Sequence, residues 1–259
     1  DQDRCVDAEI DHAEAYQGQQ VTYLLRFYRK LDRFGRQRVR QASYDEPAFS
    51  GFWSNKDSGQ TRYETRLEGQ RYLVTEVRTV LFPTVTGPLT IGPATLTVPG
   101  GFFERDTVLR SEPVTVNVLP LPGGAPDGFN GAVGRFDISA GSNATESRVN
   151  EPITVTVTLS GQGNIDTLPD PVWPDMPGWR GFDSSSSVSS GVNRGRLAGS
   201  KVYERLLVPE KAGDFTIPPI EYVYFDPEAA VYKTVSTAPI PVVVAPGSRP
   251  VADQGPVTG

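Results

Sequence analysis

The chain repeats itself, and the repeat is punctuated by prolines and glycines. Segment 81–93 (LFPTVTGPLTIGP) aligns with segment 207–219 (LVPEKAGDFTIPP) at an offset of 126, where Pro, Gly, Thr, Ile and Pro coincide. The same offset pairs 113–118 with 239–244, whereas 18–22 pairs with 150–154 at an offset of 132. The change of offset indicates a loop of different length in the two copies. Self-similarity of this kind predicts two tandem copies of one domain.

Each copy carries the alternation of an antiparallel sheet. In segment 153–160, Ile, Val, Val and Leu alternate with Thr, Thr, Thr and Ser, the period-2 pattern of a half-buried strand. The 23 prolines and 26 glycines interrupt any long helix. About seven strands per copy predict an all-β chain of two tandem immunoglobulin-like antiparallel β-sandwich domains. We expect strands near 7–14, 20–30, 61–67, 71–82, 88–97 and 113–119, then near 134–140, 152–160, 179–183, 200–208, 213–225, 231–236 and 239–245.

Turn chemistry suggests how the copies are divided. In the shared motif we expect a strand to end at the first Pro, a turn at the Gly, and a new strand at Thr-Ile. The predicted domains are 1–122 and 129–246, joined by a Pro/Gly linker at 123–128, with a flexible tail at 247–259. We also expect Phe129 and Val133 to pack into the interface. The serine-rich segment 184–191 is predicted to be an exposed, mobile loop.

The chain has no apolar run long enough to span a bilayer and no visible signal peptide. Its abrupt start and Pro/Gly-rich end suggest an excised fragment. With one cysteine no intrachain disulfide forms, which leaves the redox compartment open.

Charge is unevenly distributed along an acidic chain of net charge −6. The chain contains a local basic stripe, which we interpret as a solvated strand end and hairpin loop. The alternative is that the stripe is attracted to membrane phosphates or to an acidic patch of a partner. Nucleic acid binding is disfavoured because the overall balance is not basic. The stripe holds Arg26, Arg29, Lys30, Arg33, Arg36, Arg38 and Arg40.

Catalytic residue types are scarce. His12 is the only histidine and Cys5 the only cysteine, so a Ser-His-Asp triad, a Cys-His pair or a multi-ligand zinc site would depend on these two residues. We interpret His12 as a strand residue near a domain edge and Cys5 as part of a frayed N-terminus. Gly161-Gln162-Gly163 is interpreted as a hairpin turn, not a phosphate loop. Carboxylates lie in predicted loops, outside any recognisable glycosidase motif. We therefore predict no enzyme activity, no cofactor and no metal site.

Aromatic clusters near turns are the remaining candidates for binding. Phe52 and Trp53 belong to one loop-like cluster, and Trp173 and Trp179 bracket a proline-rich turn. Exposed aromatic rings stack on sugars or anchor protein partners. The favoured interpretation is that these rings plug the open ends of the sandwiches.

Several of these stretches together resemble the bacterial oxygen-tolerance family BatD. The resemblance runs over most of residues 16–245 and is carried by GQQVTY at 18–23, FSGFWS at 49–54, LFP at 81–83 continuing to PATL at 93–96, 114–122, GAVGRF at 131–136, AGDFTIPPIEY at 212–222 and YFDP at 224–227. It implies immunoglobulin-like domains outside the bacterial inner membrane, periplasmic or extracellular, with a C-terminal membrane anchor not contained in this chain. It also implies von Willebrand A-type proteins and a MoxR-type AAA+ ATPase as neighbours. The family offers no catalytic residues to carry over.

The resulting expectation is a non-catalytic interaction or scaffold module. The residues predicted to contact partners are Phe52, Trp53, Trp179, Asp175, Asp226, Arg33 and Arg36. One hypothesis is that an exposed loop carboxylate, Asp175 or Asp226, completes the metal site of a von Willebrand A-type partner. The alternative is a carbohydrate-binding module that uses Trp53 or Trp179, and an enzyme ranks third.

Overall fold

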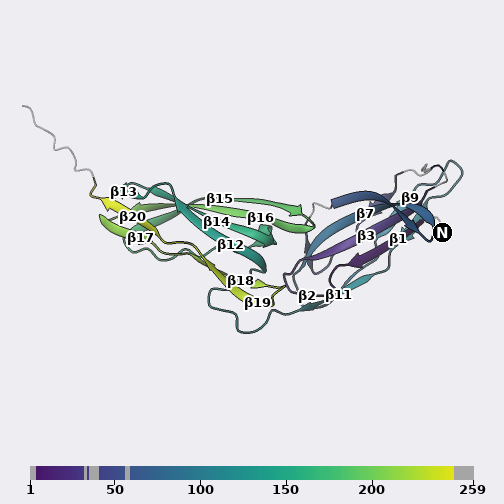
Figure 1. Cartoon of the computed structure of the whole chain (residues 1–259), viewed down its shortest axis with the longest axis horizontal. Helices are drawn as coiled ribbons and strands as arrows, with labels where there is room; N and C mark the ends of the chain where they lie inside the picture. Colours follow the sequence, from purple (N-terminus) through teal and green to yellow (C-terminus); the bar gives the residue numbers. More distant parts are fainter. Residues whose placement is uncertain (1–3, 32–33, 35–40, 56–58, 248–259) are drawn as a thin grey trace, which may run out of the picture.

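The computed structural model describes residues 4–31, 34, 41–55 and 59–247. Two β-sandwiches are joined end to end in an elongated molecule (Figure 1). Over the described residues the only helical element is a short 3-10 turn, η1 (Ile165–Thr167). The prediction of an all-β chain of two immunoglobulin-like sandwiches is confirmed.

The first sandwich has a large sheet and two small ones. The large sheet has the order β1-β3-β7-β5, with β6 also paired to β7, and the small sheets have the orders β2-β11-β8 and β10-β9-β4. The strands are β1 (Arg4–Ile10), β2 (Glu14–Tyr16), β3 (Val21–Lys30), β4 (Ser43–Asp45), β5 (Phe52–Ser54), β6 (Gly59–Leu67), β7 (Gln70–Pro83), β8 (Gly87–Ile91), β9 (Thr95–Val98), β10 (Thr107–Arg110) and β11 (Val114–Leu119).

The second sandwich repeats this arrangement. Its sheets have the orders β12-β14-β16-β15, β13-β20-β17 and β18-β19. The strands are β12 (Gly134–Ser142), β13 (Glu146–Arg148), β14 (Ile153–Gly163), β15 (Trp179–Asn193), β16 (Arg196–Pro209), β17 (Gly213–Ile217), β18 (Glu221–Asp226), β19 (Val231–Ser236) and β20 (Ile240–Ala245). Every described strand pair lies wholly before or wholly after the linker predicted at 123–128. The exact domain boundaries stay predictions.

The repeat extends to single hydrogen bonds. In the first sandwich the Thr22 N–H donates to Asp11 Oδ1 at 2.7 Å, and 132 residues later the Thr154 N–H donates to Asn143 Oδ1 at 2.8 Å. A short polar side chain after β1 or β12 thus accepts an N–H of the neighbouring strand in the sheet, β3 or β14. The shared position needs an oxygen acceptor, which both Asp and Asn provide.

A second repeated contact closes the small sheets. The Ala94 N–H donates to Ser111 Oγ at 2.9 Å, and the Ile220 N–H donates to Thr237 Oγ1 at 2.8 Å, again 126 residues apart. These four residues are buried, so each hydroxyl satisfies a backbone group that water does not reach. The sequence repeat is therefore a structural repeat.

The shared Pro-Gly motif makes the corner expected of it. Strand β7 ends at Pro83 and β8 begins at Gly87, just as β16 ends at Pro209 and β17 begins at Gly213. Gly87 has φ 100° and Gly213 φ 145°, backbone conformations that favour glycine. The two sandwiches have separate apolar cores, one around Val21, Leu81 and Ile91 and the other around Val155, Leu159 and Ile217.

The serine-rich segment was wrongly predicted to be a mobile loop. Residues 184–191 lie inside β15, which pairs with β16 through to a two-residue turn at Arg194 (φ 50°) and Gly195 (φ 78°). Two successive positive φ angles match the twist of a tight hairpin. Strand propensity is set mainly by neighbours, so pairing with β16 overrides the weak preference of serine.

Three smaller expectations were also wrong. Cys5 lies in β1 opposite Tyr28 rather than in a frayed end. His12 follows the end of β1 instead of lying on a strand. Gly161 and Gly163 do not form a turn, since they end strand β14 opposite Phe136 and Gly134 of β12.

Candidate functional site

The junction between the sandwiches is built around one leucine from a hairpin tip. Strands β15 and β16 reach from the second sandwich toward the first (Figure 1). Leu197, just past the hairpin turn, is fully buried in a cluster with Val80 and Phe82 of the first sandwich, and Trp53 packs against the same cluster. Burial of a leucine by the neighbouring sandwich couples the two units through the hydrophobic effect.

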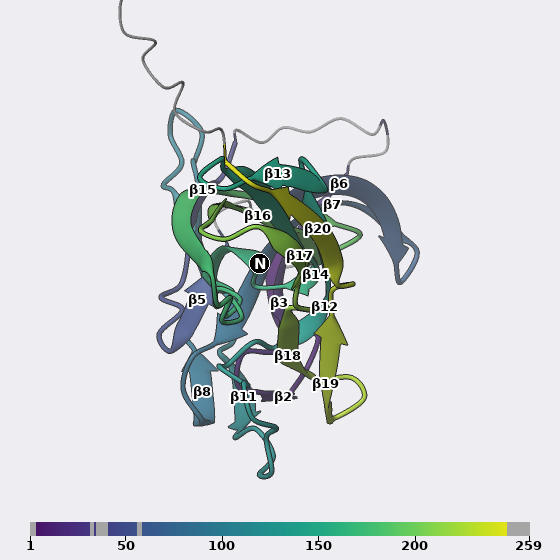
Figure 2. The ribbon, with the colours of Figure 1, turned by 90° about the vertical axis from the view of Figure 1, so that its left-hand side faces the viewer.

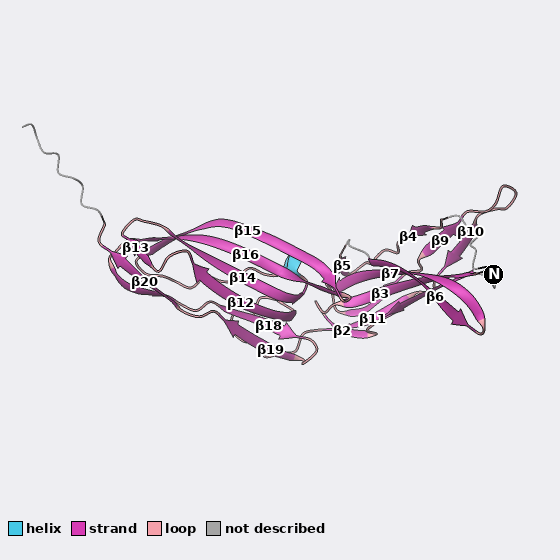
Figure 3. Ribbon diagram, turned by 45° about the horizontal axis from the view of Figure 1, so that its top comes forward, coloured by secondary structure: helices cyan, strands magenta, loops and turns pink. Residues whose placement is uncertain are grey.

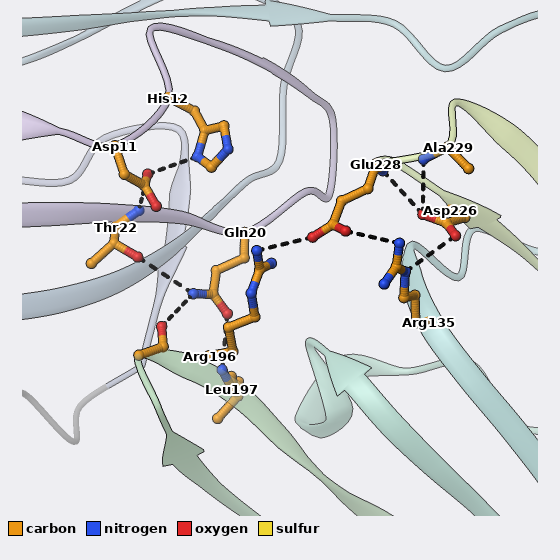
Figure 4. Close-up of polar contacts among 11 residues, drawn as sticks. Asp11, His12, Gln20, Thr22, Arg135, Arg196, Leu197, Asp226, Glu228 and Ala229 are labelled. Atoms are coloured by element: carbon orange, nitrogen blue, oxygen red, sulfur yellow. Dashed lines mark hydrogen bonds and ion pairs between the residues drawn. The ribbon is translucent and has the colours of Figure 1, made fainter.

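Gln20 fixes the hairpin tip beside this cluster. Its Nε2 donates to the Gly195 carbonyl at 2.8 Å, and its Oε1 accepts the Leu197 N–H at 2.9 Å (Figure 4). One amide side chain thus satisfies a backbone acceptor and a backbone donor of the other sandwich, as a strand would. The contact specifies both the position and the direction of the tip.

An aromatic contact forms a second part of the junction. The rings of Tyr16 and Phe225 meet edge to face with centroids 4.9 Å apart, and within the second sandwich Tyr232 packs against both Phe225 and Phe129. A β-carbon added at Gly18 would lie 3.0 Å from Val133 Cγ2, so Val133 packs directly on backbone of the first sandwich. The expected packing of Val133 into the interface is therefore confirmed, whereas the ring contact of Phe129 is with Tyr232 of its own sandwich.

Charged side chains of the second sandwich lie along one flank of the junction. Asp226 is fully buried, and its carboxylate accepts a hydrogen bond from Arg135 at 3.2 Å (Figure 4). It accepts another from Lys233 at 2.8 Å. Glu228 bridges Arg135 at 2.8 Å and Arg196 at 2.9 Å. Because Arg196 lies directly before Leu197, this network holds the base of the hairpin tip against the β18–β19 turn.

Asp226 also shapes the turn that follows it. Its Oδ1 accepts the backbone N–H groups of Glu228 and Ala229 at 3.0 and 3.2 Å. Burial alone would raise the pKa of the Asp226 carboxyl, but the Lys233 hydrogen bond, these two N–H groups and the Arg135 charge together hold the pKa below its usual value. A lowered pKa means that the ionised carboxylate stabilises the folded state.

Replacing Asp226 by asparagine is expected to reduce stability by about 2–3 kcal/mol at neutral pH, because two cations and a turn lose a buried anion. The lowered pKa adds stability above the carboxyl's unfolded-state value, and that stability is lost as pH falls through the folded-state value. The difference between wild type and Asp226→Asn in urea denaturation should therefore shrink below about pH 4. A difference that stays constant from neutral to acidic pH would contradict this assignment.

The two flanks of the junction offer different surfaces. One flank is a small polar pocket lined by Gln19, Gln20, Arg135, Arg196 and Glu228, among others. The other is a groove of about 450 Å³ in which Trp53, Leu121 and Leu168 take part. The junction thus combines a polar flank with a more apolar one.

The predicted aromatic contact residues do not form one site. Trp179 is 9% exposed and packs edge to face on Phe215, so its ring is closed to a sugar and the plug interpretation is confirmed for it. Phe52 packs against the first core. Trp53 is half-buried beside the Leu197 cluster and lines the apolar groove, so the carbohydrate alternative now rests on Trp53 alone.

The predicted charged contact residues divide in the same way. Asp175 is exposed, whereas Asp226 was wrongly expected to be an exposed loop acid. Since both Asp226 oxygens are engaged inside the protein, the carboxylate has no coordination position left for a partner's metal ion. Arg33 and Arg36 lie outside the described residues.

Two aromatic residues that the sequence reasoning passed over are the most exposed large apolar side chains described. Phe102 is 91% and Phe103 96% exposed, on the loop between β9 and β10 at the end of the first sandwich remote from the second (Figure 3). The rings contact each other edge to face at 5.0 Å, and Asp106 accepts the Gly100 N–H to close the loop. Two adjacent phenylalanines within a turn-forming segment were the available sequence signal.

The described ranges contain no group of three or more His, Cys, Asp or Glu side chains placed to hold a metal ion. No helix in that part of the chain is long and apolar enough to cross a membrane.

Fold and junction together define a pair of immunoglobulin-like sandwiches that contact each other at one junction. Residues 140–244 match the family model described as the BatD DUF11 like domain. The second sandwich is therefore similar to the BatD domain, and the family match supports the resemblance over these residues. No curated protein matches the chain in sequence.

Solved structures give distant matches. InvD of Yersinia pseudotuberculosis is 12% identical with a TM-score of 0.23, and the match covers 98% of this chain and 61% of that one. The adhesin InvE of the same species is 13% identical with a TM-score of 0.23, over 93% and 59%. FdeC, an Escherichia coli adhesin, is 14% identical with a TM-score of 0.21, over 95% and 64%. The chain thus spans about three-fifths of these relatives' length.

Proposed function

We propose that this chain is a non-catalytic, extracytoplasmic protein–protein interaction module of a membrane-anchored BatD-like protein. Its proposed setting is oxygen tolerance, beside von Willebrand A-type proteins and a MoxR-type AAA+ ATPase. The BatD match at residues 140–244 supports the family setting.

The observation that carries the interaction role is the exposed phenylalanine pair. Phe102 and Phe103 together present two apolar rings to solvent. Exposing them is unfavourable, and the fold of the single chain does not require it. The turn contacts of Gly100 and Glu104 hold the loop in this outward form. Aromatic side chains on a preformed loop are typical anchors of protein interfaces.

The junction complements this role. With Leu197 and Gln20 fixing the hairpin tip, the two sandwiches act as a spacer between the phenylalanine loop and the opposite end of the second sandwich. Asp175 remains available for a metal-bridged contact with a von Willebrand A-type partner, because its side chain is exposed. Asp226 takes no part in that proposal.

A pull-down of envelope proteins tests the proposal. The wild-type chain and the double variant Phe102→Ser, Phe103→Ser serve as bait, with Val231→Ser as a control that also removes an exposed apolar side chain, 46% exposed. We expect the double variant to retain at least about tenfold less von Willebrand A-type protein than the wild type does. The control should retain as much as the wild type. Loss with a Mg²⁺ chelator and with Asp175→Asn would support the metal bridge. Equal retention by wild type and the double variant would contradict the role of the loop.

A further inference from the structure

Strand β15 is an open edge of the second sandwich. It lies at the margin of its sheet and pairs only with β16 among the described strands (Figure 3). All ten residues 181–190 are exposed. Between Ser184 and Asn193 the strand has neither charge nor proline. Such an edge presents a row of N–H and C=O groups for pairing with another chain.

Other edges of the protein carry protection that β15 lacks. The strand in the equivalent position of the first sandwich is β6, which pairs with β7 and carries Arg62, Glu64 and Arg66 on nine residues. The opposite edge of the β15 sheet is β12, which carries Arg135 and Asp137 and lies against the β18–β19 hairpin. Charges on an edge oppose strand addition because pairing would desolvate them. One fold thus contains a protected and an unprotected version of the same edge.

A groove beside β15 has the opposite character. It measures about 460 Å³, follows the bulge at Ser184, and is lined by the carboxylates of Asp170, Asp183 and Glu204. The side chains of Asp170 and Asp183 are 73% and 87% exposed. Their nearest cations, Lys201 and Arg205, lie 3.8 Å away, beyond hydrogen-bond distance.

The wall of this groove already accommodates a cation. The Arg205 guanidinium lies 5.1 Å from the Trp173 ring centroid, and Trp173 lines the groove. A ring and three carboxylates within one groove match the chemistry of a lysine or arginine side chain. The groove opens directly at the strand, so a residue of an added strand would reach it.

We propose that β15 binds an extended segment of a partner protein as an additional antiparallel strand, with a basic side chain of that segment in the Asp170–Asp183–Glu204 groove. Backbone hydrogen bonds along 185–193 supply affinity, and the groove selects the basic residue. The inference rests on the proposed interaction role and names the partner's chemistry. The serine side chains of β15 suit this role because they leave room for a neighbouring strand.

A synthetic peptide provides the direct test. The probe is a labelled peptide of about ten residues that alternates Thr and Val around a central Arg, long enough for one strand. Fluorescence anisotropy measures its binding to the full chain, and hydrogen exchange reports on the amides of 185–193. We expect binding with slower exchange at these amides, and at least about tenfold weaker binding when the central residue is Glu.

Matched variants separate the edge from the groove. Ser189→Lys places a charge on the open edge, and Ser139→Lys places the same charge on the opposite edge strand β12, where Ser139 is also exposed. We expect Ser189→Lys to weaken binding of the Arg peptide at least about tenfold and Ser139→Lys to change it less than about twofold. The double variant Asp183→Asn, Glu204→Gln should remove the preference for Arg over Glu while leaving hydrogen exchange of the free protein unchanged.

Three results would overturn the inference. They are no binding of the Arg peptide, binding unaffected by Ser189→Lys, and self-association of the free chain that Ser189→Lys abolishes, since the last assigns the edge to a second copy. The wild-type pull-down keeps this failure separate from failure of the proposed function. If the Ser189→Lys bait retains a partner as well as the wild-type bait does, the β15 site is rejected. The proposed interaction role is not contradicted by that result.

Discussion

Replacing Leu197 by alanine is expected to uncouple the two sandwiches and to reduce stability by about 3–4 kcal/mol. The side chain is fully buried, and the buried residues around it, Val80 and Phe82, belong to the other sandwich. The cavity would therefore open at the junction rather than inside either core. Because this cluster couples the two sandwiches, its loss should turn one cooperative unfolding transition into two.

Calorimetry and urea denaturation measure both effects. Val192→Ala is the matched control, because Val192 pairs directly with Leu197 across the hairpin but is 41% exposed. The control should lose less than about 1 kcal/mol and keep a single transition. Small-angle scattering of the folded state should show a broader distribution of lengths for Leu197→Ala alone. A single, unshifted transition in Leu197→Ala would mean that the junction does not couple the sandwiches.

Replacing Gly161 by alanine is expected to destabilise the second sandwich by about 4 kcal/mol, through backbone strain and overlap together. Gly161 has φ 154°, and a β-carbon added there would overlap the backbone carbonyl of Arg135 on the facing strand. Neither backbone moves without breaking the pairing of β12 with β14, so the clash has no inexpensive relief.

Gly141 on β12 is the matched control for this substitution. A β-carbon added there meets no atom within 4 Å, and the residue lies in the same sheet. Urea denaturation should place Gly141→Ala within about 1 kcal/mol of wild type. In Gly161→Ala the second sandwich should instead unfold first. The fluorescence of Trp173 and Trp179 monitors this transition. Similar midpoints for the two variants would contradict the close approach of β12 and β14.

Individual residues show why the fold was predictable. The corner motif that begins at Pro83 and Pro209 has a local cause, because proline cannot donate to a ladder and the glycine after it takes a special φ. Alternation in 153–160 likewise depends only on which face of one strand is buried. Both signals occur twice, and the second occurrence supports the first.

The misread segments have the opposite cause. Nothing within residues 184–191 favours a strand, and Gly161-Gln162-Gly163 resembles a turn when viewed alone. Each becomes regular only because a distant strand pairs with it, β16 in one case and β12 in the other. Likewise Asp226 looks like any loop acid until Arg135, distant in sequence, and Lys233 close over it.

The sequence by itself determined the all-β class, the duplication, the corner turns and the BatD resemblance, because these depend on local backbone preferences and on periodicity. Only the tertiary structure decided which side chains are available for contact. In it Trp179 and Asp226 are buried, whereas Phe102 and Phe103 are exposed. Leu197 packs against the other sandwich, and β15 is an open edge. Exposure and pairing depend on strands far apart along the chain, and no local pattern records which strand becomes the edge.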